Sequence, residues 1–186
     1  QYNSRFVSSD LDDFVHSSSV TALPGGDLMA VWFAGSREGA ADVQVRSARF
    51  DAQSGEWGAE QVLATRESTR DGTGRYIRKL GNPVIALGPD QRLWMFYVSV
   101  SVGGWATSAI NLMVSDDLGR SWSAPRQLIT SPFFNISTLV RAAPVFHADG
   151  AIGLPVYHEF MGKFAEYLYL GELAHELVVH LSLIHI

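Results

Sequence analysis

The sequence has no cysteine, no long apolar run and no excess of positive charge. Without cysteine, disulfides and thiolate zinc sites are excluded. No run of about 18 apolar residues occurs, so we expect no membrane-spanning helix. The net charge of −5 provides no attraction to nucleic acid or to an anionic membrane, and neither is expected as a partner. What is present is apolar material, 47% of 186 residues, which is enough for the core of a globular domain.

Short apolar runs recur along the chain and are separated by Gly, Pro, Asp and Asn, which is typical of antiparallel strands. Three similar segments each read as strand, tight turn and strand, at residues 23–33, 87–97 and 147–157. Their turn aspartates lie 63 and 59 positions apart, namely Asp27, Asp90 and Asp149. This spacing suits one four-stranded propeller blade per repeat. We therefore expect an all-β chain with blades at about 14–66, 80–131 and 137–173, and no helix before residue 160.

The end of the third blade differs from the other two. We expect no fourth strand there, because residues 174–186 lose the turn residues and become a run of Leu, Ile, Val and His. A propeller needs a ring of at least about four blades, so residues 1–186 are expected to form one partial, truncated domain. The absence of Met at position 1 also suggests a processed chain or a fragment.

The tail contains a near match to the zinc motif H-E-x-x-H. His175 and His180 are five positions apart, one more than the motif allows. On a helix this spacing turns the two rings about 140° away from each other, so they could not share one zinc ion. We expect no metal and no other cofactor.

Residues 115–122 read Ser-Asp-Asp-Leu-Gly-Arg-Ser-Trp and fit the pattern S-x-D-x-G-x-[ST]-W at every fixed position. Asp117 can accept hydrogen bonds from turn amides, Gly119 permits a positive φ, and Trp122 can pack on the hairpin. The motif is the Asp-box of sialidases, and a weaker echo stands at residues 51–57. From about His16 to Tyr157 the chain resembles the BNR-repeat-like branch of the sialidase superfamily.

The resemblance implies a six-bladed propeller whose active site lies on its axis. Sialidases use a Tyr nucleophile activated by a Glu, an Asp acid–base, and three arginines that bind the sugar carboxylate. His16 stands where the first of these arginines would open the inner strand. In the loop after the second strand, Glu38 is the best match to the acid–base residue and Asp42 the second. The nucleophile and the remaining arginines would lie in blades outside this chain.

Other residues are expected to contact the substrate. Arg37 and Arg78, in neighbouring loops, could supply the guanidinium that His16 does not. Trp105, in a Gly-rich loop, could stack on a sugar. The remaining inner positions that could bind the sugar are Asn82, Arg141, His158 and Glu159. Each has a structural alternative: His16 could cap a strand, Glu38 could be a solvated loop residue, and Arg37 could pair with a neighbouring carboxylate.

These expectations lead to an exo-acting glycoside hydrolase of sialidase type that cleaves a terminal, acidic sugar from a glycan. Two alternatives stay open. In a propeller polysaccharide lyase, His16 would abstract a proton beside a uronate carboxylate. In a glycan-binding propeller without catalysis, the same fold would serve recognition alone. The partner in every case is a glycan or oligosaccharide, which favours a secreted or periplasmic location.

Overall fold

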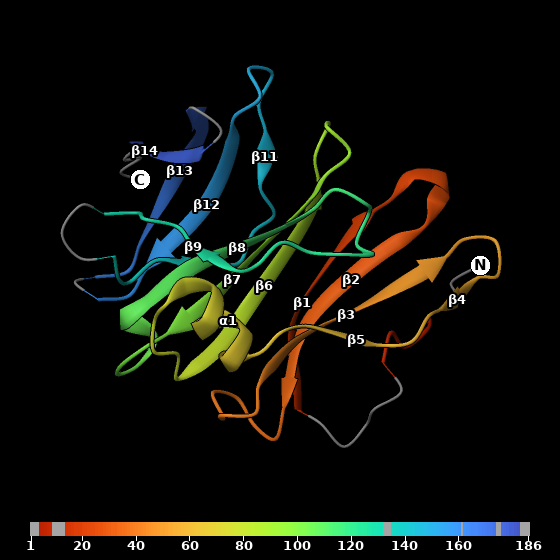
Figure 1. Ribbon diagram of the computed structural model, residues 1–186, viewed down its shortest axis with the longest axis horizontal. Helices are drawn as coiled ribbons and strands as arrows, with labels where there is room; N and C mark the ends of the chain where they lie inside the picture. The colour runs from red at the N-terminus through yellow and green to blue at the C-terminus, as the bar shows by residue number, and fades with distance from the viewer. Residues whose placement is uncertain (1–3, 9–13, 132–134, 161, 174–175, 183–186) are drawn as a thin grey trace.

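The computed structural model describes residues 4–8, 14–131, 135–160, 162–173 and 176–182. Within these ranges the chain forms three antiparallel sheets and one short α-helix (Figure 1). The sheets follow one another along the chain and lie side by side, with the second between the first and the third.

Each sheet begins at its inner strand and runs outward. The first sheet consists of β1 (Phe14–Ala22), β2 (Leu28–Gly35), β3 (Gln44–Asp51), β4 (Glu56–Trp57) and β5 (Gln61–Ala64), and β4 and β5 both pair with β3. The second consists of β6 (Lys79–Leu87), β7 (Leu93–Val100), β8 (Ser108–Ser115) and β9 (Arg126–Gln127). Short 3-10 turns lie between β1 and β2 (η1, Pro24–Gly26) and before β8 (η2, Trp105–Thr107).

The third sheet has an interrupted inner strand. Two short strands, β10 (Leu139–Val140) and β11 (Val145–Phe146), pair with β12 (Ile152–His158), which is followed by β13 (Phe164–Leu173) and β14 (Glu176–Ser182). The prediction that this sheet lacks a fourth strand was wrong, because β14 pairs with β13 along its length. The tail contains β-branched valines, which favour a strand even without a turn motif. Of the two tail histidines, His180 lies in β14, and His175 lies outside the described residues.

Two hydrophobic clusters join the sheets, and β7 belongs to both. Successive side chains of a strand point to opposite faces, so β7 sends Met95 and Tyr97 toward the first sheet and Phe96 and Val98 toward the third. All eight residues of β7 are buried. The second sheet is therefore packed on both faces at β7, which explains why this strand is apolar apart from Ser99.

The inner strands β1 and β6 carry the same irregularity. Their pairing shifts register within residues 16–19 and 81–84. Each shift contains a non-glycine residue with positive φ, Ser17 at 51° and Asn82 at 44°. The two bulges meet, because Ser17 Oγ donates to Asn82 Oδ1 at 3.1 Å. Bulges re-aim side chains, and left-handed residues other than glycine often mark functional sites.

The Asp-box forms the predicted turn. The Asp117 carboxylate accepts hydrogen bonds from the Ser121 amide at 2.8 Å, the Ser121 hydroxyl at 2.6 Å and the Ser115 hydroxyl at 2.8 Å. These bonds lower the pKa of Asp117 to about 2. Gly119 has a φ of 90°, and Trp122 packs on the cluster between the first and second sheets. The structural role predicted for the motif is confirmed.

The helix α1 (Arg66–Thr73) was not expected from the sequence. It begins with a capping box, in which Thr65 and Ser68 exchange side chain-to-backbone hydrogen bonds. Only Thr69 is buried, and its hydroxyl lies 2.8 Å from the Tyr97 hydroxyl. The helix thus has no apolar stripe, which is the signal that sequence periodicity detects.

Candidate functional site

The two ends of the strands differ. The turns that contain Asp27, Asp90 and Asp149 and the Asp-box lie at one end, which we call the turn end. The starts of β1 and β6 and the loops that follow β2, β7 and β12 lie at the other, which we call the loop end, because consecutive strands are antiparallel. All predicted site residues lie at or near the loop end: His16, Arg37, Glu38, Asp42, Arg78, Asn82, Arg141, His158 and Glu159.

A pocket of about 270 Å³ opens between the inner strands of the three sheets. It brings together three of the predicted residues, His16, Asn82 and Arg141. The rest of its lining consists of Ser17, Ser18 and Pro83. Arg141 is exposed and makes no hydrogen bond or ion pair with any residue that the structure describes. Its guanidinium is therefore available to an anion, which it can bind with two parallel N–H groups.

His16 has a defined tautomer. Its Nδ1 accepts a hydrogen bond from the Ser17 amide at 2.8 Å, so the neutral ring carries its hydrogen on Nε2. The ring centroid lies 5.9 Å from that of Phe14 and 5.6 Å from that of Phe33. In this tautomer His16 presents an N–H donor to a ligand and has no free nitrogen lone pair.

Sequence reasoning missed Tyr157 as a site residue. Its hydroxyl accepts from Asn82 Nδ2 at 3.3 Å, and Asn82 in turn accepts from Ser17, so one hydrogen-bond chain links the three sheets. Burial and the Glu159 charge raise the pKa of Tyr157, against the smaller opposing effects of Asn82 and Arg141. The phenol stays protonated at neutral pH and can donate. The only signal in the sequence was its place at the end of the third repeated segment, residues 147–157.

The loop after β2 contains the two predicted catalytic carboxyls, and they differ. Asp42 accepts hydrogen bonds from the Ser36 amide at 3.1 Å and the Ser36 hydroxyl at 3.0 Å. The Ser36 bonds, with a contribution from the Arg37 charge, lower the pKa of Asp42, so it stays ionised and engaged in its loop. Glu38 is exposed and, among the described residues, has no hydrogen bond or ion pair. Of the two carboxyls, Glu38 is therefore the one that makes no hydrogen bond within the described part of the chain.

Lys79, at the start of β6, was also missed. Its Nζ lies 3.8 Å from the centroid of the Trp105 ring. A Cβ added at Gly81 would come within 2.7 Å of that ring, so glycine is needed for Trp105 to lie against β6. Burial and the neighbouring Arg78 lower the pKa of Lys79, and Glu38 opposes them. A lone lysine between two predicted segments carried no signal in the sequence.

Two predicted residues are engaged within the protein. His158 Nε2 hydrogen-bonds Glu166 at 2.5 Å, and its ring stacks on Phe164 with the centroids 4.4 Å apart. The Glu166 side chain is 5% exposed, so His158 is the partner of a buried carboxylate. Arg78 donates to the Gly103 carbonyl at 3.2 Å. These contacts hold the loops around the pocket, and neither residue lines it.

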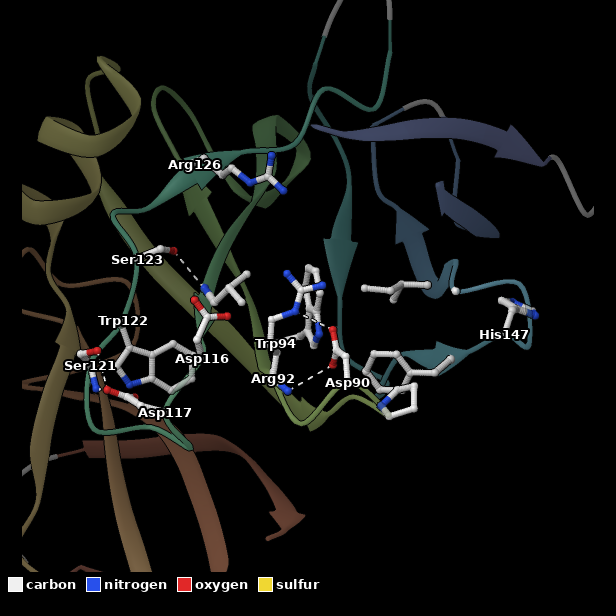
Figure 2. A pocket seen from close by; sticks show the side chains of 15 residues that line it. Asp90, Arg92, Trp94, Asp116, Asp117, Ser121, Trp122, Ser123, Arg126 and His147 are labelled. Carbon is white, nitrogen blue, oxygen red and sulfur yellow. Dashed lines mark hydrogen bonds and ion pairs between the residues drawn. The ribbon is translucent and has the colours of Figure 1, made fainter. Parts of the chain in front are cut away.

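A larger cleft of about 610 Å³ lies at the turn end, between the Asp-box and the turns of the second and third sheets (Figure 2). Some of its polar groups are paired, whereas Asp116 and Arg126 have no hydrogen-bond or ion-pair partner among the described residues. Arg92 pairs with Asp90 at 2.5 Å and covers the Trp94 ring at 4.9 Å, while Asp117 is bound within its own turn. The smaller pocket brings together three of the predicted residues from different sheets, and it is therefore the candidate site. Within the described residues, no cluster of three or more His, Asp or Glu side chains is placed to hold a metal ion.

Residues 26–176 match the BNR repeat-like domain family, and the chain belongs to this family. No curated protein sequence matches it significantly. No helix in the described part of the chain is long and apolar enough to cross a membrane.

Several solved structures share the fold at low sequence identity. A protein of unknown function from Dyadobacter fermentans is 10% identical with a TM-score of 0.71, over 92% of this chain and 54% of that one. A Hadza microbial sialidase is 16% identical with a TM-score of 0.68, over 89% of this chain and 37% of that one. A family 117 glycoside hydrolase from Zobellia galactanivorans is 12% identical with a TM-score of 0.64, over 94% of this chain and 58% of that one.

The chain thus spans between 37% and 58% of the length of these three proteins. Its fold is that of a sialidase-like β-propeller, as the Asp-box and the repeated hairpins predicted. The division of the chain into three blades of one incomplete domain stays a prediction.

Proposed function

We propose that the protein is an exo-acting glycoside hydrolase of sialidase type, which removes a terminal acidic sugar from a glycan. The observation that carries this proposal is the pocket where Arg141, His16 and Asn82 meet from three sheets. A free guanidinium beside an imidazole N–H and a side-chain amide suits a sugar carboxylate. Two proteins with the same fold, a sialidase and a family 117 glycoside hydrolase, support the same class of activity.

Within this proposal Glu38 is the general acid–base. A carboxyl that protonates the leaving oxygen must reach its protonated form and must not be consumed by internal hydrogen bonds. Asp42 fails this condition, because Ser36 keeps it ionised. Tyr157 lies outside the lining of the pocket and positions Asn82, whose Nδ2 donates to its hydroxyl.

The lyase alternative has less support. It requires His16 to accept a proton from the carbon beside a uronate carboxylate. The Ser17 amide occupies Nδ1, so the neutral ring presents only its Nε2 hydrogen. Hydrolysis does not need His16 as a base.

Binding is tested with Arg141→Ala. We expect the affinity for N-acetylneuraminate to fall about 10–100-fold by calorimetry, because a charge-assisted hydrogen bond contributes about 1.5–3 kcal/mol. The control is Arg126→Ala, at the turn-end cleft, which should leave the affinity unchanged. Equal losses in both variants would indicate a non-specific charge effect and would contradict the assignment of the pocket.

Turnover is tested with Glu38→Gln, which should keep the affinity and abolish release of the terminal sugar from a fluorogenic glycoside. Glu67→Gln, in the first turn of α1, is the matched control. Unchanged turnover in Glu38→Gln would reject its role. Because the nucleophile is expected in blades outside this chain, turnover is measured on a protein that includes those blades. Sugar binding with no turnover in that protein would favour the glycan-binding alternative, and an ultraviolet-absorbing unsaturated product would favour the lyase.

A further inference from the structure

A lysine held against a tryptophan lies on the same inner strand as the pocket but outside its lining. The sequence has only two lysines, Lys79 and Lys163. Lys79 opens β6, three positions before Asn82, and its ammonium lies over the Trp105 ring. One of the two lysines of the protein therefore lies at the loop end, at the start of an inner strand.

The place of Lys79 is built by two loops. On one side Trp105, from the loop before β8, lies against β6 where Gly81 has no side chain. On the other side is the loop after β2, where a Cβ added at Gly39 would stand 3.3 Å from Lys79 Cδ. The lysine stem therefore lies between loops of two sheets, and its ammonium is directed by packing.

The charge of Lys79 is incompletely compensated. Among the described residues no carboxylate lies within ion-pair distance of its Nζ. Glu38 is the acidic group whose charge acts on it, while burial and Arg78 act against the ammonium form and lower its pKa. An incoming anion would supply the missing partner.

We propose that Lys79, positioned by Trp105, forms a second anion-binding subsite that takes the carboxylate or sulfate of the sugar next to the terminal one. The substrate is then an acidic oligosaccharide with a negative charge on more than one unit. The oligosaccharide part of this inference rests on the proposed function. Anion binding by Lys79 does not depend on it.

The first test uses sulfate as the probe and the whole chain with its lysines methylated by ¹³C-formaldehyde. Two lysine signals are expected, and Lys79→Met assigns them. Replacing chloride by sulfate at constant ionic strength should raise the pKa of Lys79 and leave the exposed Lys163 signal in place. Trp105→Ala should abolish the sulfate response, because the ammonium is then free to leave its position. A Lys79 response no larger than that of Lys163 would overturn the proposal.

The second test compares N-acetylneuraminate with its α2,8-linked dimer. Lys79→Met should weaken binding of the dimer about tenfold and leave the monomer unaffected, because only the dimer has a second carboxylate. Arg141→Ala should weaken both. If Lys79→Met does not weaken dimer binding while Arg141→Ala weakens both sugars, this inference is contradicted. If Arg141→Ala weakens neither sugar while Lys79→Met still weakens the dimer, the proposed function is contradicted. If neither sugar binds, the sulfate response decides.

Discussion

The turn end and the loop end of the same three sheets differ in how their acidic turn residues and their pocket residues are bonded. At the turn end two of the aspartates that shape the turns are held in place: Asp27 binds Arg49 at 2.7 Å, and Asp117 is surrounded by its own turn. At the loop end Arg141 and Glu38 have no hydrogen-bond or ion-pair partner among the described residues. In the function proposed above, the unpaired groups of the loop end would be the donors and acceptors for a ligand.

The largest expected difference concerns glycine at the two ends. Gly119→Ala should lower the free energy of unfolding by about 1–3 kcal/mol, because a side chain is strained at positive φ. The new Cβ would also lie 3.0 Å from Met29 Cε. Gly104→Ala, in a loop-end position with a φ of −104° and no atom within 4 Å, should change stability by less than about 0.5 kcal/mol. Urea unfolding measures the free energy of unfolding of both variants. Equal losses of stability would contradict the expected difference between the two ends.

The next difference concerns strain at the loop-end bulges. Asn82 has a φ of 44°, so Asn82→Ala should be less stable than Asn82→Gly by about 1 kcal/mol, although both lose the same hydrogen bonds. At Ser18, whose φ is not in the left-handed region, Ala should instead be at least as stable as Gly. Urea unfolding of the four variants tests this. The same order of Ala and Gly at both positions would mean that the bulge stores no strain.

The smallest expected effect is a pH dependence at the turn end. The pKa of Asp117 in the folded chain is about 2, below its ordinary value of 3.8, because Ser121 and Ser115 donate to its carboxylate. Its contribution to stability is therefore present above about pH 4 and is lost as the pH falls toward 2.

Asp117→Asn should remove this acid dependence. The difference in melting temperature between the unaltered protein and the variant should shrink from pH 5 to pH 2. Asp116→Asn, which is exposed and makes none of these hydrogen bonds, is the control and should show no such trend. A difference that stays constant for Asp117→Asn would argue against the lowered pKa.

Parts of the fold could be predicted because their signals are local. The Asp-box contains its own hydrogen-bond partners within eight residues, and the three repeated segments each contain a strand, a turn and a strand close together in the sequence. The helix α1 was not predicted, because its signal in the sequence is a capping box and it has no apolar stripe. The strand β14 was not predicted, because the absence of turn residues was interpreted as the absence of a strand.

The candidate site could be predicted only in part. His16, Asn82 and Arg141 follow from one rule, that polar residues at the start of inner strands lie near a propeller's axis, and the structure places all three in one pocket. Tyr157 and Lys79 could not be found in this way. Their roles depend on Asn82 and Trp105, which are 75 and 26 positions away along the chain.

The sequence by itself determined the all-β fold, the repeated hairpins, the Asp-box turn and the family, because each depends on residues close together in the chain. The tertiary structure decided which polar groups stay free. It placed Asn82 between Ser17 and Tyr157 of the neighbouring sheets, and it left Glu38 and Arg141 without hydrogen-bond or ion-pair partners among the described residues. Hydrogen bonding and burial depend on neighbours in space, and those are set only when the three sheets pack together.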